Sequence, residues 1–362
     1  MMVHADAAPL VEIRRGSITE SLHRGFLCAV DGTGRVIAAI GEPEKAITYL
    51  RSSAKPFQAI PLVASGAADR FCFSPEEIAL CCGSHSGESI HIETVARMLS
   101  KIGLTPDSLK CGVHEPFSRI VTQQLRASGQ KPDPRHHNCS GKHTGMLALA
   151  IHLGAQIDKY DQADNPVQIE IIQAVSLFSG TAVNDLIIAT DGCGVPTFGM
   201  NIQSMALMYA RLANIAVGIS RDICNVGPSI SNAVKRIFAA MVSHPEMVGG
   251  THERLDTEII LTTNGKVVSK IGAEGVYAAG VNPSERWPMG LGIVLKIENG
   301  DDRRARHVAV IEALTQLGIL PTSKPETLAQ FDKSILKNHH GDIVGEVRSC
   351  FRINLHESSH NL

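Results

Sequence analysis

Two residues in the segment Arg51-Ser52-Ser53-Ala54-Lys55-Pro56 have the types and the spacing needed for acyl transfer. Ser52 and Lys55 are three residues apart at the predicted start of a helix. Because three residues make just under one helical turn, their side chains would share a face. A serine hydroxyl becomes a nucleophile when a base takes its proton, and a lysine with a lowered pKa can be that base. Most such pairs are solvated helix surface, so this spacing needs support from elsewhere in the chain.

A second serine lies in the glycine-rich segment Gly83-Ser84-His85-Ser86-Gly87. Small residues let backbone approach a ligand closely, and Ser84 on such a turn could be a nucleophile or an oxyanion donor. The alternative is a turn between two helices that is capped by serine. A second lysine, Lys270, lies on a predicted strand that continues into Gly272-Ala273-Glu274-Gly275, although Lys266 is on the same predicted hairpin. A lysine on a strand beside the site is also found in Ser-x-x-Lys enzymes.

Two cysteine-containing segments could bind a metal ion. Cys139 and Lys142 are three apart at the start of a predicted helix, whose positive end would lower the pKa of the thiol. A glycine-rich turn directly after an apolar run contains Asp191, Gly192 and Cys193, and such turns often present side chains at a cleft. Since tetrahedral zinc needs three or four ligands, two thiolates would require a nearby histidine, a neutral Lys142 or water to complete the site. The alternative is a polar capping loop with a buried cysteine.

The composition narrows the classes of partner. The chain has 362 residues, with 34 basic and 36 acidic residues and a formal net charge of −2. This balance argues against nucleic acid or an anionic membrane as a main partner. The N-terminal residues lack the pattern of a signal peptide, and no apolar run reaches the roughly 18 residues of a membrane span, so we expect a cytoplasmic protein. Nine cysteines without a dense framework indicate reduced thiols.

Strand patterns lie near both ends of the sequence, and helical patterns fill the middle. An Asp31-Gly32 turn joins predicted strands at 22–30 and 35–40, and an Asn264-Gly265 step predicts a hairpin of strands 258–263 and 266–271. We therefore predict an α+β fold with one antiparallel sheet built from both chain ends. Residues 1–362 would form one catalytic domain with a sheet lobe at about 10–50 and 255–355 and a helical lobe at about 52–250. The other predicted elements are helices at 55–68, 90–102, 118–128, 140–153, 166–178, 201–213, 230–243 and 301–317, and strands at 290–297 and 342–348.

Taken together and in this order, these segments resemble the Rhizobium etli-type L-asparaginases, the asparaginase II family. The resemblance extends over nearly the whole chain, from Arg14 to the last predicted strand. It implies hydrolysis of L-asparagine to L-aspartate and ammonia, a fold like that of glutaminases and serine β-lactamases, and a homodimer. It rests on the five segments that begin at Arg51, Gly83, Asn138, Asp191 and Lys270.

The same resemblance assigns roles to individual residues. It implies two serine–lysine pairs, Ser52–Lys55 and Ser84–Lys270. We favour Ser52 as the nucleophile, with Ser84 relaying protons, and expect backbone N–H groups of the glycine-rich turns to bind the oxyanion. It also implies a Zn²⁺ ion on Cys139, Lys142 and Cys193, and substrate-binding positions at Arg51, His85, Asn138, Asp191, Gly192 and Glu274.

Zinc in such a site would have much of its charge neutralised by the two thiolates. We therefore expect it to position the α-carboxylate or α-amino end of the substrate rather than to activate the nucleophile. Two other functions remain open from the sequence. One is a different Ser-Lys amidohydrolase, such as a glutaminase or a β-lactam-recognising protein, and the other is a zinc-binding protein without enzymatic activity.

Overall fold

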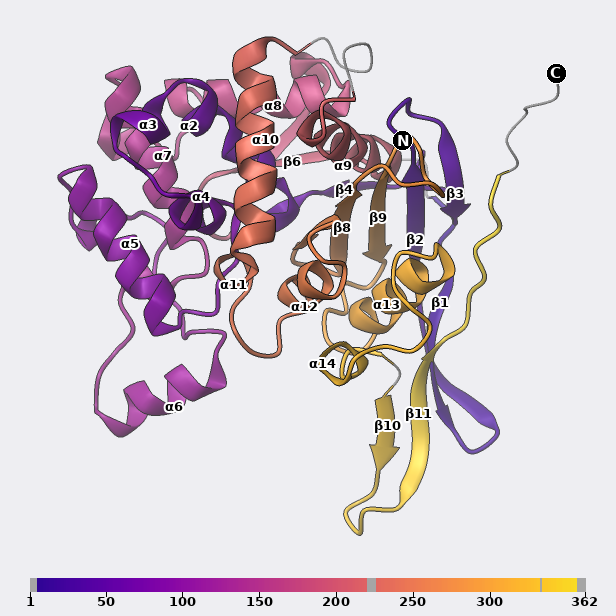
Figure 1. Ribbon diagram of the computed structural model, residues 1–362. Helices are drawn as coiled ribbons and strands as arrows, with labels where there is room; N and C mark the ends of the chain where they lie inside the picture. Colours follow the sequence, from indigo (N-terminus) through magenta and orange to yellow (C-terminus); the bar gives the residue numbers. More distant parts are fainter. Residues whose placement is uncertain (1–4, 220–225, 333, 357–362) are drawn as a thin grey trace, which may run out of the picture. The chain divides into compact units, whose positions relative to one another are not determined.

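A computed structural model describes residues 5–219, 226–332 and 334–356 of the chain (Figure 1). The chain divides into two compact units. The first, which we call the sheet unit, contains Met1–Ser53, Met200–Asn214 and Glu258–Leu362. The second, the helical unit, contains Ala54–Gly199 and Ile215–Thr257. Among the described residues, no helix combines the length and the apolar character needed to cross a lipid bilayer.

The sheet unit is built around an antiparallel sheet that uses both ends of the chain, which confirms the predicted α+β class. In Figure 1, indigo strands from the N-terminal part lie beside orange and yellow strands from the C-terminal part. Strand β3 (Val36–Ile40) pairs with β2 in the hairpin predicted at Asp31. The order of the remaining strands is β10 (Ser334–Lys337), β11 (Ile343–Ser349), β1 (Ala8–Arg15), β2 (Ile18–Val30), β9 (Leu291–Ile297), β8 (Val276–Val281) and β7 (Val267–Ile271). A short strand β4 (Ile47–Tyr49) also belongs to this unit.

The strand predicted at 258–263 is wrong, because this segment lies in helix α12 (Leu255–Thr262). Asn264 and Gly265 have positive φ angles of 50° and 70°, and Gly265 N–H donates to the Ile260 carbonyl at 3.0 Å. An Asn-Gly step favours both a hairpin turn and the left-handed end of a helix, since each requires positive φ. Here it ends the helix, and β7 pairs instead with β8.

Two longer helices and one short helix also belong to the sheet unit. Helix α9 (Ile202–Ala216) packs closely on the sheet at Gly292, where a Cβ atom would lie 1.8 Å from the Ala206 carbonyl oxygen. Helix α13 (Arg306–Gln316) packs against β1, β8, β9 and β11, and α14 (Glu326–Ala329) follows it. The helix predicted from residue 301 begins at Arg306, because the Asp301 carboxylate accepts backbone N–H groups in a turn before it.

The helical unit surrounds α7 (Ser140–Leu153), which is buried on all sides over its first eleven residues. The helix predicted at 55–68 is divided into three short helices, because Pro56 and Pro61 lie in first turns and Gly66 has a φ of 85°. A hairpin of β5 (Ile187–Thr190) and β6 (Pro196–Asn201) presents the turn at Asp191. The remaining helices are α1 (Lys55–Gln58), α2 (Ile60–Ala64), α3 (Ala67–Arg70), α4 (Pro75–Cys82), α5 (Ser89–Lys101), α6 (Arg119–Ala127), α8 (Pro166–Ser179), α10 (Pro228–Ser243) and α11 (Pro245–Val248).

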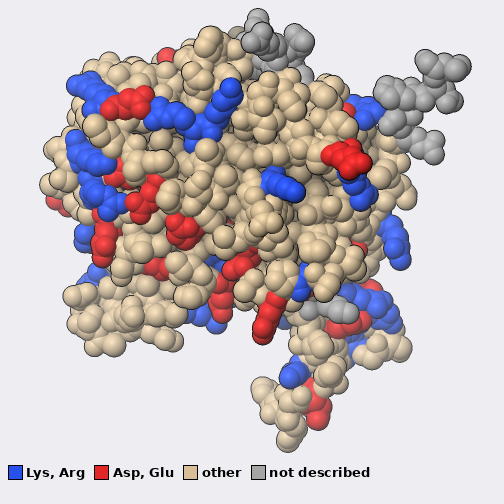
Figure 2. Space-filling view, in the orientation of Figure 1, with Lys and Arg blue, Asp and Glu red and all other residues tan. Residues whose placement is uncertain are grey.

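The charged side chains follow the near-neutral composition. On the face drawn in Figure 2, Lys and Arg are interspersed with Asp and Glu rather than collected into one large patch of a single sign. Ion pairs such as Arg236–Asp69, at 2.7 Å, contribute to this mixture. This face therefore offers no extended basic surface of the kind that nucleic acid requires.

Candidate active site

Lys55, the first residue of α1, is the centre of a buried polar cluster in the helical unit. Its side chain is fully buried. The side-chain nitrogen Nζ donates to the Gly83 carbonyl at 2.5 Å and to the Asn138 carbonyl at 3.2 Å, and lies 3.0 Å from Ser84 Oγ. The structure therefore pairs Lys55 with Ser84, whereas the sequence-based pairing joined Lys55 to Ser52 and Ser84 to Lys270.

The surroundings of Lys55 favour its neutral form. Burial lowers the pKa of the Lys55 amine, and the charge of Lys142 lowers it further, against an opposing effect from Cys139 and Cys193. A neutral amine has two N–H donors and one lone pair. With both donors directed at the Gly83 and Asn138 carbonyls, the lone pair can accept the hydroxyl proton of Ser84. This is the arrangement that a general base needs.

Ser84 follows α4 in a turn that is fixed through its backbone. Its N–H donates to the Val248 carbonyl at 2.8 Å, and its carbonyl accepts from Arg254 Nη2 at 2.6 Å. The Arg254 guanidinium lies 5.4 Å from the centre of the Phe117 ring, a cation–π distance. Since both backbone groups of Ser84 are occupied, its hydroxyl is the group left for chemistry beside Lys55.

The predicted oxyanion donors are engaged elsewhere in the helical unit. The Ser84 N–H donates to Val248, Gly87 N–H donates to His85 Nδ1 at 3.1 Å, and Gly192 N–H donates to Asp191 Oδ1 at 2.9 Å. Gly194 N–H is likewise used by the Asp191 carbonyl. An N–H that already has an acceptor is not available for a developing negative charge without rearrangement. The glycines of these turns therefore shape the turns rather than supply free donors.

The predicted metal ligands are close together. Lys142 Nζ lies 3.0 Å from Cys193 Sγ, and Cys193 Sγ lies 3.8 Å from Asp191 Oδ2. A hydrogen bond from the Cys193 thiol holds the pKa of Cys139 well below its ordinary value, assisted by the charges of Lys55 and Lys142. Burial opposes a charge on Lys142, but the neighbouring Cys193 and Cys139 sulfurs outweigh it and raise the Lys142 pKa. Both shifts favour a thiolate at Cys139 beside an ammonium group at Lys142.

The donor set of this cluster fits a zinc ion. The described residues include no group of three or more His, Cys, Asp or Glu side chains that could hold a metal, so a third ligand must come from outside these types. Lys142 is such a ligand, and it would have to lose its proton on binding. His143, the next residue, does not form such a group with the two cysteines. Its Nδ1 lies 2.7 Å from Tyr160 Oη, and its buried Nε2 has no hydrogen-bond partner in the described part of the chain.

The other predicted residues of the helical unit have structural contacts. His85, predicted to bind substrate, is fully buried. Its Nδ1 accepts from Gly87, and its Nε2 lies 2.8 Å from Ser140 Oγ, so both ring nitrogens are used within the protein. The Asn138 carbonyl accepts from Lys55, its N–H donates to His114 Nε2 at 3.1 Å, and its side-chain Oδ1 lies 3.1 Å from the same ring nitrogen.

The remaining predicted residues belong to the sheet unit. Arg51 and Glu274 form an ion pair at 3.8 Å, and both adopt positive φ angles, of 50° and 61°. Such backbone conformations are costly and are found preferentially at functional sites. Lys270 on β7 is fully buried whereas Lys266 is exposed, which favours Lys270 over Lys266 as the functional lysine. Ser52 is half-buried in a short 3-10 helix, Arg51–Ala54.

The sequence motifs did not identify Arg254, His114 or His143 as parts of this cluster. Arg254 follows a loop, and no nearby sequence pattern connects it with Ser84. His114 lies outside the segments whose residue types and spacing suggested catalytic or metal-binding chemistry. His143 lies within a segment that we considered for metal binding, and its position directly after Lys142 could have indicated that it belongs to the cluster.

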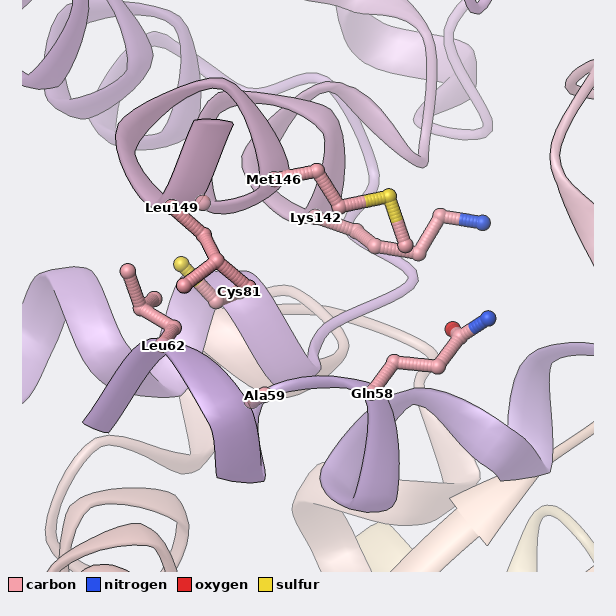
Figure 3. Close-up of a pocket in the computed structure, with 8 residues that line it drawn as sticks. Gln58, Ala59, Leu62, Cys81, Lys142, Met146 and Leu149 are labelled. Atoms are coloured by element: carbon pink, nitrogen blue, oxygen red, sulfur yellow. The ribbon is translucent and has the colours of Figure 1, made fainter. Parts of the chain in front are cut away.

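A small cavity lies beside the cluster in the helical unit (Figure 3). It has a volume of about 10 Å³, measured as space open to the centre of a water molecule. A cavity of this size can hold about one water molecule and no larger ligand. Its walls are formed by Gln58, Ala59, Leu62, Cys81, Lys142, Gly145, Met146 and Leu149.

Comparison with known proteins identifies a family match that covers most of the chain. A family model described as L-asparaginase II matches residues 11–349. No curated protein matches the sequence.

The matches to solved structures are more distant. The native form of a protein named Mglu is 14% identical with a TM-score of 0.42, over 84% of this chain and 66% of that chain. A Bacillus subtilis glutaminase in covalent complex with 5-oxo-L-norleucine is 16% identical with a TM-score of 0.37, over 80% of this chain and 88% of that chain. A Bacillus glutaminase in 4.3 M NaCl is 15% identical with a TM-score of 0.39, over 82% and 92%. The chain thus spans just under two thirds of Mglu.

Proposed function

The chain belongs to the L-asparaginase II family, a family of amidohydrolases, and we propose that it hydrolyses L-asparagine to L-aspartate and ammonia. The observation that carries this proposal is the 3.0 Å contact between Lys55 Nζ and Ser84 Oγ in a buried setting. A serine beside a lysine whose pKa is lowered by burial is a nucleophile with its base.

In the proposed reaction, Ser84 Oγ attacks the side-chain amide carbon and its proton moves to Lys55 Nζ. The tetrahedral intermediate breaks its C–N bond, and Lys55 gives the proton to the leaving nitrogen, which departs as ammonia. Water then attacks the ester, Lys55 takes its proton, and the proton returns to Ser84 as aspartate leaves. This assignment reverses the preference for Ser52 that the sequence motif suggested. Ser52 and Lys270, which the sequence-based pairing joined to Lys55 and to Ser84, keep a proposed supporting role in catalysis.

Zinc is part of the proposal through Cys139, Lys142 and Cys193. When bound, zinc would supply a positive charge that orients the α end of the substrate. Lys55 and Ser84 would still carry out the proton transfers. From the family resemblance we also propose a Rhizobium etli-type homodimer that works in the cytoplasm.

The test compares ammonia release from L-asparagine by the wild type, Ser84→Ala, Ser52→Ala and Lys55→Met, each with a zinc measurement. We expect Ser84→Ala and Lys55→Met to lose about 10³-fold or more in kcat, as removal of a nucleophile or its base does in other hydrolases. Acid-quenched samples should contain an aspartyl ester on a peptide with Ser84. An ester on Ser52, with Ser84→Ala still active, would reverse the assignment of the nucleophile.

Substrate choice is tested separately with L-glutamine and nitrocefin. We expect ammonia release from L-asparagine to exceed that from L-glutamine, and no turnover of nitrocefin. Faster turnover of L-glutamine or of nitrocefin than of L-asparagine would contradict the proposal that asparagine is the substrate. Zinc binding without turnover of any of the three would favour the binding-protein alternative.

A further inference from the structure

A pocket of the sheet unit shares no residue with the proposed reaction or the zinc site. Its volume is about 250 Å³, measured as space open to the centre of a water molecule. Its walls come from the end of α12, the start of β7, the end of β8, the loop after β8 and the residues after α13 (α12, β8 and α13 in Figure 1). Pockets for drug-sized ligands have volumes of about 300–1,000 Å³, so this one fits a smaller molecule.

Two cationic side chains, Lys266 and Arg286, line this pocket, and both residues are exposed. Neither forms an ion pair with a carboxylate of the described residues, and no Asp or Glu in that part of the chain lines the pocket. A larger pocket of the helical unit is different, because its Arg236 is paired at 2.7 Å with Asp69, which lines the same pocket. The positive charge at Lys266 and Arg286 is not compensated in this way, so it favours a negatively charged ligand.

Asn282 adds a carboxamide to the wall beside Lys266. Its backbone N–H donates to the Lys266 carbonyl at 2.9 Å, and its buried Oδ1 has no hydrogen-bond partner in the described part of the chain. Such buried atoms are uncommon, so hydrogen bonding within the protein does not explain an amide at this position. Because Oδ1 is buried, the accessible end of the amide is Nδ2, which is a donor. The lysine, the arginine and this amide all offer donors, and anionic oxygen atoms can accept from each of them.

The indole ring of Trp287 forms another part of the wall, and Trp287 is the only tryptophan of the chain. Its Nε1 donates to the Leu317 carbonyl at 3.2 Å, which fixes one edge of the ring. The Arg286 guanidinium lies 5.2 Å from the ring centre, a cation–π distance. An anion that binds Arg286 changes the charge beside the indole, so the emission of Trp287 reports on this pocket.

We propose that this pocket binds a small dianion through Lys266, Arg286 and the Asn282 amide. The ligand class is a dicarboxylate or a phosphate, which share negatively charged oxygen atoms as hydrogen-bond acceptors. Two negative charges match the two cations, whereas an uncharged molecule of the same shape lacks this attraction. The inference goes beyond the proposed function, because it concerns binding in the sheet unit and does not depend on hydrolysis of asparagine.

The test follows the emission of Trp287 in the full chain while succinate or inorganic phosphate is added. The ionic strength is held constant, because salt screens the attraction between charges. We expect a saturable change with at least one of these anions and none with succinamide, the uncharged counterpart of succinate. Saturation with succinate alone would identify a dicarboxylate site, and saturation with phosphate alone would identify a phosphate site. Absence of saturation with both anions, or an equal response to succinamide, would overturn the proposal.

Substitutions in the wall then locate the bound anion. Lys266→Met removes a charged donor and should weaken binding about tenfold or more, and Asn282→Asp, which adds a negative charge, should weaken it at least as much. Lys266→Arg retains the charge and should bind within about threefold of the wild type. Lys337→Met, at an exposed position of β10, is the matched control and should bind as the wild type does. Equal affinity in the wild type and Lys266→Met, at matching melting temperatures, would place the anion elsewhere and refute the site.

Discussion

At the scale of single residues, two stacked histidines support the turn that carries Ser84. The rings of His85 and His91 are 4.9 Å apart. His91 Nδ1 accepts from Glu88 N–H at 3.0 Å, and its Nε2 lies 2.9 Å from the Glu246 carbonyl, so the ring is neutral with its proton on Nε2. His85 has the same tautomer, since its Nδ1 accepts from Gly87. A second proton on either ring would lie on Nδ1, where it would face the backbone N–H that now donates to that nitrogen.

These histidines make stability dependent on pH. Burial lowers the pKa of His91 below 6.5, although Glu88 and Glu246 oppose this effect and Arg254 adds to it. Burial also lowers the pKa of His85 well below that value. The stabilisation is therefore complete above about pH 6.5 and is lost as the pH falls toward the lowered pKa. A histidine pKa that is lower by one in the folded chain than in the unfolded chain changes the free energy of unfolding by about 1.4 kcal/mol across this range.

We expect the melting temperature to fall between pH 7.5 and pH 5.5, and to fall less in His91→Gln, whose amide can still donate to Glu246. His252→Gln, at an exposed position, is the control and should retain the full dependence. A dependence in His91→Gln equal to that of the wild type would show that other groups are responsible.

The sequence could identify the lysine of the site but not its partner. Ser-x-x-Lys spacing indicates neighbours on one helix, so it joined Lys55 to Ser52. The observed contact is with Ser84, 29 residues later in the chain. Arg254 was missed for the same reason, because it fixes Ser84 from a distance of 170 residues along the chain. Contacts between such separated segments depend on tertiary packing, which cannot be predicted from the spacing of residues within one segment.

At the scale of secondary structure, the packing of α7 against α4 determines where Ser84 lies. Gly141 and Gly145 of α7 face the end of α4, which leads directly into the Ser84 turn. A Cβ at Gly141 would lie 2.5 Å from the Leu80 carbonyl oxygen. A Cβ at Gly145 would lie 2.8 Å from Cys81 Sγ, which is the end of a side chain. Only the second contact can be relieved by a change of rotamer.

We expect Gly141→Ala to destabilise the protein by about 1–3 kcal/mol and to lower kcat, because α4 must move and Ser84 moves with it. Gly145→Ala should be close to neutral, since a gain in helix propensity of about 1 kcal/mol offsets the contact with Cys81. Melting temperature and ammonia release measure both effects. In a Cys81→Ala background Gly145→Ala should be fully tolerated, whereas Gly141→Ala should remain harmful. Rescue of Gly141→Ala in that background would contradict this account.

The element predictions succeeded where one pattern dominated the segment. The helices predicted at 140–153 and 166–178 match α7 and α8, because continuous apolar positions end at Gly154 and Gly180, both with positive φ. The strand predicted at 258–263 failed because a run of isoleucine and leucine before Asn264-Gly265 fits a strand and a buried helix equally well. Packing against the rest of the protein determined that this segment forms a helix.

At the scale of the whole molecule, the antiparallel sheet and the helical unit follow from the order of strands and helices along the chain. The sheet unit takes strands from both ends, as predicted, and the predicted site residues are distributed over both units. Lys55, Ser84 and the cysteine cluster lie in the helical unit, and Arg51, Ser52, Lys270 and Glu274 lie in the sheet unit.

Zinc would join two segments of the helical unit that are far apart in sequence, since Cys139 directly precedes α7, Lys142 lies in its first turn and Cys193 lies in the β5–β6 turn. Metal removal should therefore loosen that turn and lower the melting temperature. Because Lys55 and Ser84 carry out the proton transfers in the proposed reaction, we expect chelation to raise KM for asparagine more than tenfold and to lower kcat less than about threefold. Cys193→Ser should reproduce both effects, and Cys350→Ser, at an exposed position, should have neither. A collapse of kcat at unchanged KM would instead assign the metal a direct part in the chemical step.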